Sequence, residues 1–227
     1  FLCLSKGERS MEVEKYRGVW GGRTESGEEM WWTEPEAGLK KGALSSRIKF
    51  SLDHKHHYLG RFIKDYLKSK TPQEIQNLKI VDFGCGTGGT TMNFSNYFGL
   101  PVHGLDLFLT QIQVAQNFAA KTKSNCQFST LAADGSIPLP DQSVDILISI
   151  DVLGHVPDVQ KTLNDWARVL KPGGVISAFC EATYSTDDHS LMKKLAAEGF
   201  DMMLTHPEHI SLHPREKLEA MFENAGF

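Results

Sequence analysis

The fold is decided by the stretch Val81–Thr91, which reads VDFGCGTGGTT. It follows an apolar run, and four of its eleven residues are glycine. Glycine lets a chain leave a β-strand through a sharp turn, and it lets a ligand approach the backbone where a Cβ would be in the way. A helix that starts directly after such a turn points its N-terminus at the ligand. The stretch therefore predicts a strand, a ligand-binding turn and a helix.

Two cofactor patterns fit these glycines. Gly84-x-Gly86-x-x-Gly89 has the spacing of a dinucleotide fingerprint, whereas Asp82-x-Gly84-x-Gly86-x-Gly88 is the pattern of proteins that bind S-adenosylmethionine (SAM). Asp82 favours the second pattern, because a carboxylate at a strand end can face a cationic ammonium but is unfavourable beside an anionic pyrophosphate. We therefore expect a cofactor with a positively charged end.

Strands and helices alternate on both sides of the glycine turn. The segment at 144–150, VDILISI, is almost entirely apolar, as is typical of a strand buried on both faces. The alternation predicts an α/β fold, a doubly wound and Rossmann-like sheet that is mainly parallel and has helices on both faces. Strands are expected at 78–83, 101–106, 126–132, 144–150 and 175–180, and helices near 88–98, 108–121 and 158–170.

The residues before the sheet differ in composition from those within it. Residues 51–69 carry apolar side chains at three- and four-residue steps, which predicts an amphipathic helix. Residues 11–50 are rich in tryptophan, glycine and acidic residues and predict an arm that packs on the main domain or covers a ligand as a lid. The expected regions are an expression or upstream remnant at 1–10, a helical or irregular arm at 11–70, and a SAM-binding domain at 71–227 with a substrate-side insert at 181–214.

Composition narrows the class of protein. The chain has 227 residues and a formal net charge of −4, without a basic tract that would suggest nucleic acid as a partner. Its four cysteines lack CxxC spacing, which favours reduced thiols and a cytoplasmic location. No apolar run approaches the roughly 20 residues of a membrane helix. We therefore expect no nucleic-acid partner and no membrane insertion.

Polar residues follow the other predicted strands. Asp106 ends the second strand and can accept hydrogen bonds from ribose hydroxyls, in either cofactor class. Asp134 follows the third strand and can accept a hydrogen bond from an adenine amine. Asp151 and His155 follow the fourth strand, at the edge where ligands of such sheets bind. These side chains are expected to meet around one cofactor.

The ordered motifs resemble those of the class I SAM-dependent methyltransferases, most closely the ubiquinone/menaquinone branch. The resemblance covers about residues 78–180 and includes Val81–Gly88, Gly104–Asp106, Ala133–Gly135 and SIPLPDQSVDILISIDVLGHVPD followed by RVLKPGG. It implies that Asp82, Gly84, Gly86 and Gly88 hold the methionine part of SAM, that Asp106 binds the ribose, and that Asp134 and Gly135 bind the adenine. Further cofactor contacts are expected from Cys85, Leu107 and Ile150.

The resemblance implies an enzyme that transfers a methyl group from SAM to an oxygen, nitrogen or carbon atom of a small organic molecule, with S-adenosylhomocysteine as product. His155 is the candidate general base, and Asp151 and Tyr184 are candidate substrate contacts. No metal site is expected, because Pro207 interrupts the histidine-rich segment HPEHISLH. The alternatives are a non-catalytic SAM-binding or regulatory module and an NAD-dependent oxidoreductase.

The chain ends at Asn224–Phe227, where the family's sheet usually continues with two more strands. We therefore expect the C-terminal strands to be missing and strand 175–180 to lie at an exposed, apolar edge. Such an edge favours strand-to-strand pairing or a homodimer.

Overall fold

A five-stranded parallel sheet forms the centre of the computed structural model, in the order β6-β5-β4-β7-β8. The strands are β4 (Ile80–Phe83), β5 (His103–Asp106), β6 (Gln127–Thr130), β7 (Val144–Ile150) and β8 (Leu170–Phe179). The structure describes residues 12–16, 19–23, 29–33, 54–180, 182, 194, 198 and 209–227.

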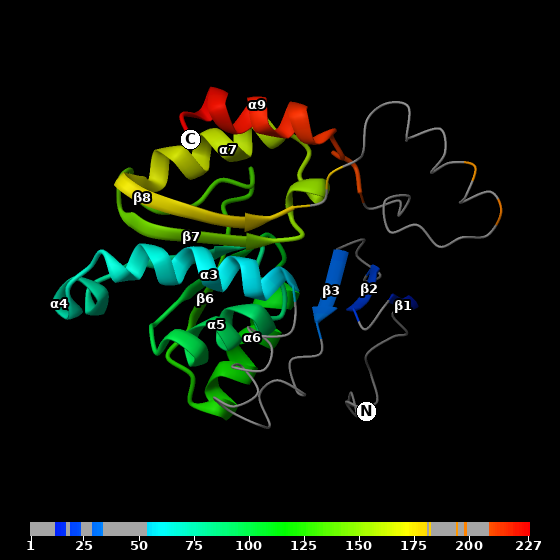
Figure 1. Cartoon of the computed structure of the whole chain (residues 1–227). Coiled ribbons are helices and arrows are strands. Elements are labelled where there is room, and N and C mark those ends of the chain that lie inside the picture. The colour runs from blue at the N-terminus through cyan, green and yellow to red at the C-terminus, as the bar shows by residue number, and fades with distance from the viewer. Residues whose placement is uncertain are drawn as a thin grey trace.

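Helices cover both faces of this sheet (Figure 1). On one face lie α3 (His54–Lys68), α5 (Gly89–Phe98) and α6 (Leu109–Thr122), and on the other lie α7 (Val159–Val169) and α9 (Arg215–Ala225). The short α4 (Pro72–Gln76) follows α3, and the 3₁₀ turn η1 (Leu153–His155) follows β7. The predicted doubly wound α/β fold is confirmed.

The alternation of side chains along the strands divides the core in two. In β7, Ile146 and Ile148 pack with the helices α3, α5 and α6, while Leu147 points to the opposite face and packs with Trp166 of α7. Successive side chains of a strand point to opposite faces, so an unbroken apolar strand can serve both layers. This explains why the central strands are apolar at almost every position.

The strand order creates a switch point between β4 and β7. From β4 the chain proceeds to β5 and β6 on one side of the sheet, and it then crosses to β7 and β8 on the other side. In such sheets ligands bind outside the carboxyl ends of the strands at the point where the direction reverses. The glycine turn follows β4 at this point.

Strand β8 begins five residues earlier than predicted. The expected start was residue 175, but Leu170 already pairs with Val144, and the register shifts before Val175 pairs with Ile146. The segment Lys171–Gly174 forms the irregularity and includes Gly173 at φ 78°. Proline and glycine thus interrupt the ladder without ending the strand, which is their usual effect at a bulge.

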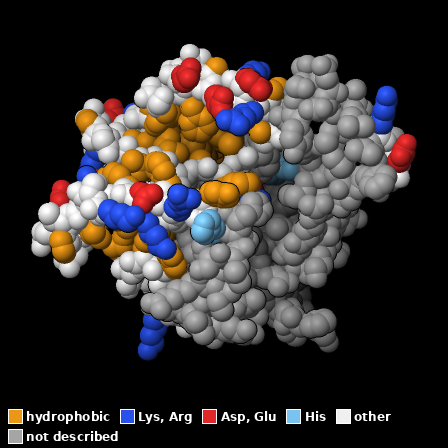
Figure 2. Space-filling model, in the orientation of Figure 1, with side chains coloured by type: hydrophobic (Ala, Val, Ile, Leu, Met, Phe, Trp, Pro, Cys, Tyr) orange, Lys and Arg blue, Asp and Glu red, His pale blue; other side chains and the backbone are white. Residues whose placement is uncertain are grey.

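Among the described strands, β8 lies at the edge of the sheet. Figure 2 shows hydrophobic side chains gathered in this region, between α3 and α9. The side chains of Val175, Ile176 and Phe179 are half-buried. The predicted apolar edge is therefore present, whereas the predicted dimer or strand pairing stays a prediction.

The N-terminal arm differs from the expectation of a helical or irregular segment. Its described residues form a three-stranded antiparallel sheet of β1 (Glu12–Tyr16), β2 (Val19–Arg23) and β3 (Glu29–Thr33). Aromatic and β-branched residues favour strands, and Trp20 pairs with Trp32 across β2 and β3. The tryptophans that suggested simple packing thus belong to a small sheet, whose β3 contacts α6.

Several expectations fall on other parts of the chain. The predicted remnant at 1–10 and most of the insert at 181–214 lie outside the described residues. The helix predicted at 51–69 is α3, which contributes Leu59 and Ile63 to the core. No described helix has the length and apolarity that crossing a membrane requires.

Candidate active site

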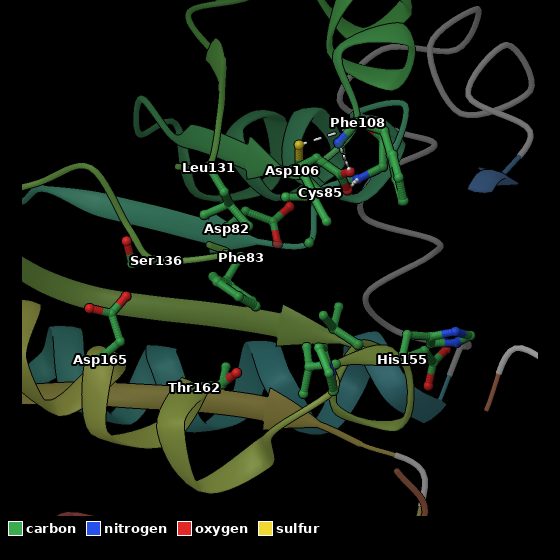
Figure 3. A pocket seen from close by; sticks show the side chains of 18 of the residues that line it. Asp82, Phe83, Cys85, Asp106, Phe108, Leu131, Ser136, His155, Thr162 and Asp165 are labelled. Carbon is green, nitrogen blue, oxygen red and sulfur yellow. Dashed lines mark hydrogen bonds between the residues drawn. The ribbon is translucent and has the colours of Figure 1, made fainter. Parts of the chain in front are cut away.

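A cavity of about 790 Å³ lies at the carboxyl edge of the sheet. The turns after β4, β5, β6 and β7 line it, together with the inner face of α7 and one residue of the C-terminal segment, His209. Figure 3 shows His155 at one end of this cavity and Ser136 and Asp165 at the other, with Asp82 and Phe83 between them. Its size is in the usual range for small-molecule and cofactor sites.

The glycine turn is held against the neighbouring strand. The amides of Gly84 and Cys85 both donate to the carbonyl of Leu105, at 2.8 and 3.0 Å. Gly84 has φ +73°, and a Cβ there would lie 2.3 Å from Cγ2 of Val152. Only glycine therefore fits between β4 and the turn after β7, which keeps the backbone open to the cavity.

Asp82 lies beneath this turn with only 2% of its surface exposed. The hydroxyl of Thr91, in the first turns of α5, donates to Asp82 Oδ2 at 2.5 Å. Burial raises the pKa of Asp82 to about 7; the Thr91 bond opposes this rise, and the nearby charge of Asp106 adds to it. The carboxylate is thus poised to ionise when a cation enters the cavity.

Asp106 ends β5 and is almost fully buried. One carboxylate oxygen accepts from the Gly86 amide at 2.9 Å, and the other accepts from the Phe108 amide at 3.1 Å and the Gln111 side chain at 3.4 Å. Asp106 therefore ties the glycine turn to the turn after β5. The carboxylate lines the cavity, where it can face a ligand hydroxyl.

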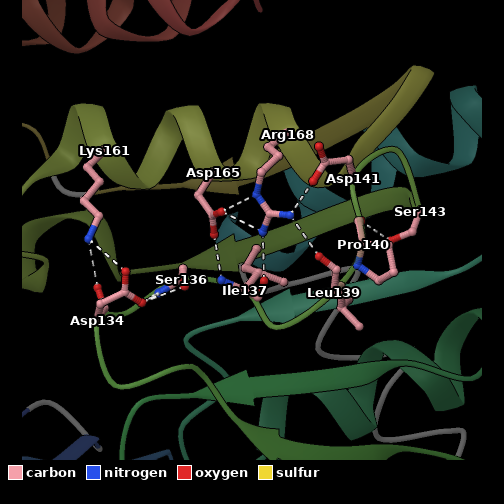
Figure 4. Close-up of polar contacts among 10 residues, drawn as sticks. All are labelled: Asp134, Ser136, Ile137, Leu139, Pro140, Asp141, Ser143, Lys161, Asp165 and Arg168. Carbon is pink, nitrogen blue, oxygen red and sulfur yellow. Dashed lines mark hydrogen bonds and ion pairs between the residues drawn. The ribbon is translucent and has the colours of Figure 1, made fainter.

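Asp134 and Lys161 line the cavity beside Ser136, and Figure 4 shows the contacts among the three. Asp134 Oδ1 accepts from the amide and the hydroxyl of Ser136, and Lys161 of α7 donates to Oδ2 at 3.2 Å. The Ser136 bonds, aided by Lys161, lower the pKa of Asp134 to about 2.

Arg168 of α7 holds the neighbouring loop at 134–141. Its guanidinium donates hydrogen bonds to the carboxylates of Asp165 and Asp141 and to the carbonyls of Ile137 and Leu139, which fixes this loop on α7.

Two histidines lie at the other end. The rings of His155 and His209 are 4.6 Å apart between centroids and tilted by 55°. Ser211 holds the two segments together, since its amide donates to Gly154 O at 3.0 Å and its hydroxyl donates to Val156 O at 2.5 Å. A segment 55 residues further along the chain is thereby fixed against η1.

Asp151 lies in the same region with a left-handed backbone, φ 55°. Its amide donates to Phe179 O at 2.8 Å, and its carboxylate forms an ion pair with Lys55 of α3. The Lys55 ammonium also lies 5.1 Å from the centroid of the Phe179 ring. The carboxylate of Asp151 is thus paired with a helix that the sequence did not connect with this position.

Most of the residues predicted from the sequence meet in the cavity. Gly88 does not line it: it caps α5, and a Cβ there would lie 2.7 Å from the Phe128 ring. Tyr184 lies outside the described residues. The predicted residues that line the cavity are Asp82, Gly84, Cys85, Gly86, Asp106, Leu107, Asp134, Gly135, Ile150, Asp151 and His155.

Sequence reasoning missed other lining residues, among them Thr87, Thr90, Val152, Lys161 and His209. Thr87 and Thr90 lie within the glycine turn and could have been found by extending that motif. Lys161 is on the cavity face of an amphipathic helix, which periodicity reveals only once the location of the cavity is known. His209 carried no local signal that separated it from the neighbouring histidines.

The lining residues fit a cofactor that carries positive charge. Six carboxylates line the cavity, Asp82, Asp106, Asp134, Asp151, Asp158 and Asp165, against one lysine and one arginine. The Thr87 hydroxyl is buried and has no hydrogen-bond partner among the described residues, so it can bind a polar ligand group. Within the part of the chain that the structure describes, no three His, Cys, Asp or Glu side chains converge as a metal site would require.

Comparisons with known proteins agree with this geometry. A family model described as a methyltransferase domain matches residues 81–178. The ubiquinone biosynthesis O-methyltransferase of Bartonella tribocorum is 35% identical over 102 residues, which cover 45% of this chain and 40% of that protein. The YcgJ protein of Bacillus subtilis has the same fold with a TM-score of 0.57, is 26% identical, and is matched over 75% of this chain and 68% of its own.

A further solved structure, phosphoethanolamine N-methyltransferase 2 of Haemonchus contortus in complex with SAM, is 22% identical with a TM-score of 0.53. The match covers 74% of this chain and 36% of that one, and it concerns the fold. The chain spans between 27% and 42% of the length of the curated relatives it matches. Residues 81–178 thus match the methyltransferase-domain family, and their strand order and strand-end residues are those of a class I SAM-dependent methyltransferase domain.

Proposed function

We propose that this protein binds SAM in the cavity and transfers its methyl group to a small organic molecule. The observation that carries the proposal is the buried carboxylate of Asp82 directly beneath an open glycine turn. A buried carboxylate with a raised pKa is a favourable partner for the ammonium of an amino acid and an unfavourable one for a phosphate. The match of residues 81–178 to a methyltransferase domain supports the same cofactor.

In this proposal each part of SAM has its own contacts. Asp82, Gly84, Cys85 and Gly86 hold the methionine part, with Gly88 shaping the turn from behind. Asp106 and Leu107 hold the ribose, since Asp106 lies at the end of the adjacent strand and its carboxylate lines the cavity. The adenine is held by Asp134, Gly135 and Ile150.

When bound, SAM supplies an electrophilic methyl group on a positively charged sulfur. The protein's part is to align the acceptor in line with the methyl and the sulfur and to exclude water from the cavity. His155, at the end of the cavity away from Asp134, is the proposed general base for an acceptor that must lose a proton. Asp151 and Tyr184 remain the proposed substrate contacts.

Charge argues against the NAD-dependent alternative. A pyrophosphate would enter a cavity in which carboxylates outnumber the lysine and arginine, and both of these bases are already paired with Asp134, Asp141 or Asp165. The other alternative, a non-catalytic SAM-binding or regulatory module, would bind the same cofactor and differ only in that it transfers no methyl group. The acceptor atom stays open at this level, because the named relatives include both an O- and an N-methyltransferase.

Calorimetry with SAM, S-adenosylhomocysteine and NAD tests the cofactor. We expect SAM and S-adenosylhomocysteine to bind and NAD not to bind; binding of NAD alone would refute the proposal.

Two variants test the roles of single residues. Asp106→Ala should weaken the binding of SAM by about 1–3 kcal/mol through lost hydrogen bonds. His155→Ala should slow turnover more than it weakens SAM, and SAM binding without turnover of any acceptor would instead support the module.

A further inference from the structure

We propose that the first turn of α3 belongs to the active site, with Lys55 and His56 as positioning residues for the methionine end of SAM. The inference rests on the proposed function, because it concerns the same cofactor in the same cavity. It goes further in extending the site to a helix outside residues 81–178, which match the methyltransferase domain. Neither side chain lines the cavity, so both act through residues that do.

The methionine end of the cavity lies where two segments of the chain separate. The ladder between β4 and β7 ends at the pair Asp82–Ile148. One residue further, the hydroxyl of Ser149 donates to Phe83 O at 3.1 Å. Beyond these contacts one segment enters the glycine turn and α5, and the other enters η1. Both segments line the cavity, so their separation decides how a ligand between them is held.

Consecutive residues of α3 contact these two segments. Lys55 forms an ion pair with Asp151, the residue after β7. Nε2 of His56 lies 3.5 Å from the hydroxyl of Thr90, in the first turn of α5. Thr90 and Asp151 both line the cavity. One helical turn thus bridges the two sides of the switch point.

The position of this turn is fixed by the rest of α3. Leu59 and Ile63 are buried in the core, with 4% and 0% of their surfaces exposed. The hydroxyl of Ser177 in β8 donates to Leu59 O at 3.4 Å. Figure 1 shows α3 on the same face of the sheet as α5. Because α3 is anchored in the core, its first turn serves as a fixed reference for the two segments.

The contact with Asp151 leads to the glycine turn. Asp151 has a left-handed backbone, φ 55°, and its amide donates to Phe179 O. Such a backbone persists only where its surroundings hold it, and the Lys55 pair holds the side chain. The next residue, Val152, packs so closely on the turn that a Cβ at Gly84 would lie 2.3 Å from its Cγ2. A shift of Asp151 therefore shifts the turn that the proposed function assigns to the methionine part.

The contact with Thr90 leads to Asp82. Thr91, the next residue of α5, donates to Asp82 Oδ2 at 2.5 Å. His56 is only 6% exposed, so its ring is confined where it meets α5. A shift of this first turn of α5 moves the hydroxyl that bonds the carboxylate assigned to the ammonium. Each contact of α3 is thus one residue removed from a residue that touches the proposed methionine site.

Burial distinguishes the Lys55 pair from an ordinary surface pair. The side chains of Lys55 and Asp151 are 25% and 30% exposed. Those of Lys68 and Asp65, at the other end of α3, are 76% and 60% exposed. The Lys55 ammonium also lies 5.1 Å from the centroid of the Phe179 ring. Charges partly removed from water interact more strongly than exposed ones, so loss of Lys55 should affect the cavity and loss of Lys68 should not.

Two ligands that differ in the methionine part test this role. S-adenosylhomocysteine carries the amino acid end, whereas 5′-methylthioadenosine has the same adenosine and a methyl group in place of that end. In calorimetry with the full chain, Lys55→Gln and His56→Leu should each raise the Kd for S-adenosylhomocysteine about tenfold and leave that for 5′-methylthioadenosine within about twofold. Equal losses for the two ligands, or no loss for either, would overturn the proposal.

Conservative and exposed substitutions provide the rescue and the controls. Lys55→Arg keeps the charge and His56→Gln keeps a polar group, so both should bind S-adenosylhomocysteine within about threefold of the unmodified protein. The matched controls are His57→Leu and Lys68→Gln, at exposed positions of the same helix, and they should leave both Kd values unchanged. Controls that weaken binding as much as Lys55→Gln would assign a general structural role to α3 and overturn the inference.

A double variant tests the route through Asp151. In an Asp151→Asn background, Lys55→Gln should weaken S-adenosylhomocysteine by less than about twofold, because the partner of the lysine is already lost. A loss in this background as large as that in the unmodified protein would show that Lys55 acts by another route, which overturns its assignment.

Hydrogen exchange tests the coupling in the unmodified protein, without any substitution. A ligand that α3 helps to position must in turn stabilise α3, because coupling between two sites is reciprocal. S-adenosylhomocysteine should slow exchange of the Tyr58 and Leu59 amides about fivefold, and 5′-methylthioadenosine should not. Unchanged exchange with S-adenosylhomocysteine bound overturns the inference and leaves the cofactor site in place. A chain that binds neither SAM nor S-adenosylhomocysteine refutes the proposed function itself.

Discussion

Asp82 combines burial with a charge that its proposed role requires. Its pKa in the folded chain is raised from 3.8 to about 7, mainly by burial. A carboxyl whose pKa is raised on folding contributes stability below its unfolded pKa, and that contribution is lost as pH rises through the folded pKa. Without ligand, the protein should therefore lose stability between about pH 4 and pH 7, by up to about 4 kcal/mol.

Asp82→Asn should remove this pH dependence, because the amide stays neutral. In the unmodified protein SAM should bind more tightly at pH 8 than at pH 6, since binding of its ammonium favours the ionised carboxylate. The variant should bind SAM at least tenfold more weakly at pH 8 and with little dependence on pH. Urea unfolding and calorimetry across pH 5–8 measure both effects.

The control for this prediction is Asp65→Asn, on the exposed face of α3, where Asp65 pairs with Lys68. Its stability and its SAM binding should follow the pH profile of the unmodified protein. A pH-independent SAM affinity in the unmodified protein would contradict the assignment of Asp82 to the ammonium.

At the scale of elements, α5 has a left-handed glycine at each end. Gly88 precedes the helix with φ 81°, and Gly99 follows it with φ 70°. A Cβ at Gly88 would meet the Phe128 ring at 2.7 Å and Ala115 Cβ at 3.0 Å, while a Cβ at Gly99 would meet nothing within 4 Å. The two positions therefore share the backbone strain and differ in the space available.

Gly99→Ala should cost about 1–2 kcal/mol of unfolding free energy, from the left-handed backbone alone. Gly88→Ala should cost a further 1–3 kcal/mol or so through overpacking against Phe128. The difference between the urea midpoints of the two variants measures the steric part. Equal losses would show that the Phe128 ring moves aside at little cost.

Helix α3 is tied to the carboxyl ends of β7 and β8. Lys55 pairs with Asp151, its ammonium faces Phe179, and Ser177 of β8 donates to Leu59 O at 3.4 Å. This helix also brings His56 to 3.5 Å from the Thr90 hydroxyl, in the first turn of α5. Its first turn thus contacts two residues that line the cavity, Thr90 and Asp151.

Lys55→Gln should loosen this end of α3, because it leaves the half-buried Asp151 without its cation. Hydrogen exchange of the amides in the first two turns of α3 should become about tenfold faster, while those near Lys68 stay unchanged. Lys68→Gln, which breaks an exposed pair with Asp65, serves as the control and should leave the stability nearly unchanged, because surface ion pairs contribute little. Equal behaviour of the two variants would show that the Asp151 pair does not hold the helix.

At the scale of the molecule, the cavity joins parts of both cores. Phe83 and Leu131 belong to the core under α7, and Cys85 and Ile150 belong to or pack against the core under α3, α5 and α6. All four line the cavity. A ligand that binds there therefore stabilises contacts on both faces of the sheet.

S-adenosylhomocysteine at about 100 times its Kd should stabilise the fold by about 2.7 kcal/mol, and NAD at the same concentration should not. Hydrogen exchange should slow in α5 and α7, on opposite faces of the sheet, and stay unchanged in α4. Slowing confined to one face would indicate that the ligand occupies only part of the cavity.

The sequence by itself determined the sheet and half of the site. Apolar content predicted β7, because a strand buried on both faces carries a nearly unbroken apolar signal. The alternation of strands and helices placed β4, β5 and β6 to within a few residues. Asp82, Asp106 and Asp134 were predicted because each lies at or shortly after the end of a strand, and parallel strands bring their carboxyl ends to one edge. These predictions needed only the order of elements along the chain.

Only the tertiary structure decided the rest. The pairing of β1, β2 and β3, the ion pair of Lys55 with Asp151, and the contact of His209 with His155 join residues that are distant or ambiguous in sequence. Such contacts depend on how whole elements pack, and no local pattern encodes them. The glycine turn was readable in VDFGCGTGGTT because its backbone requirement is local, whereas the His155–His209 end of the cavity depends on segments brought together by the fold.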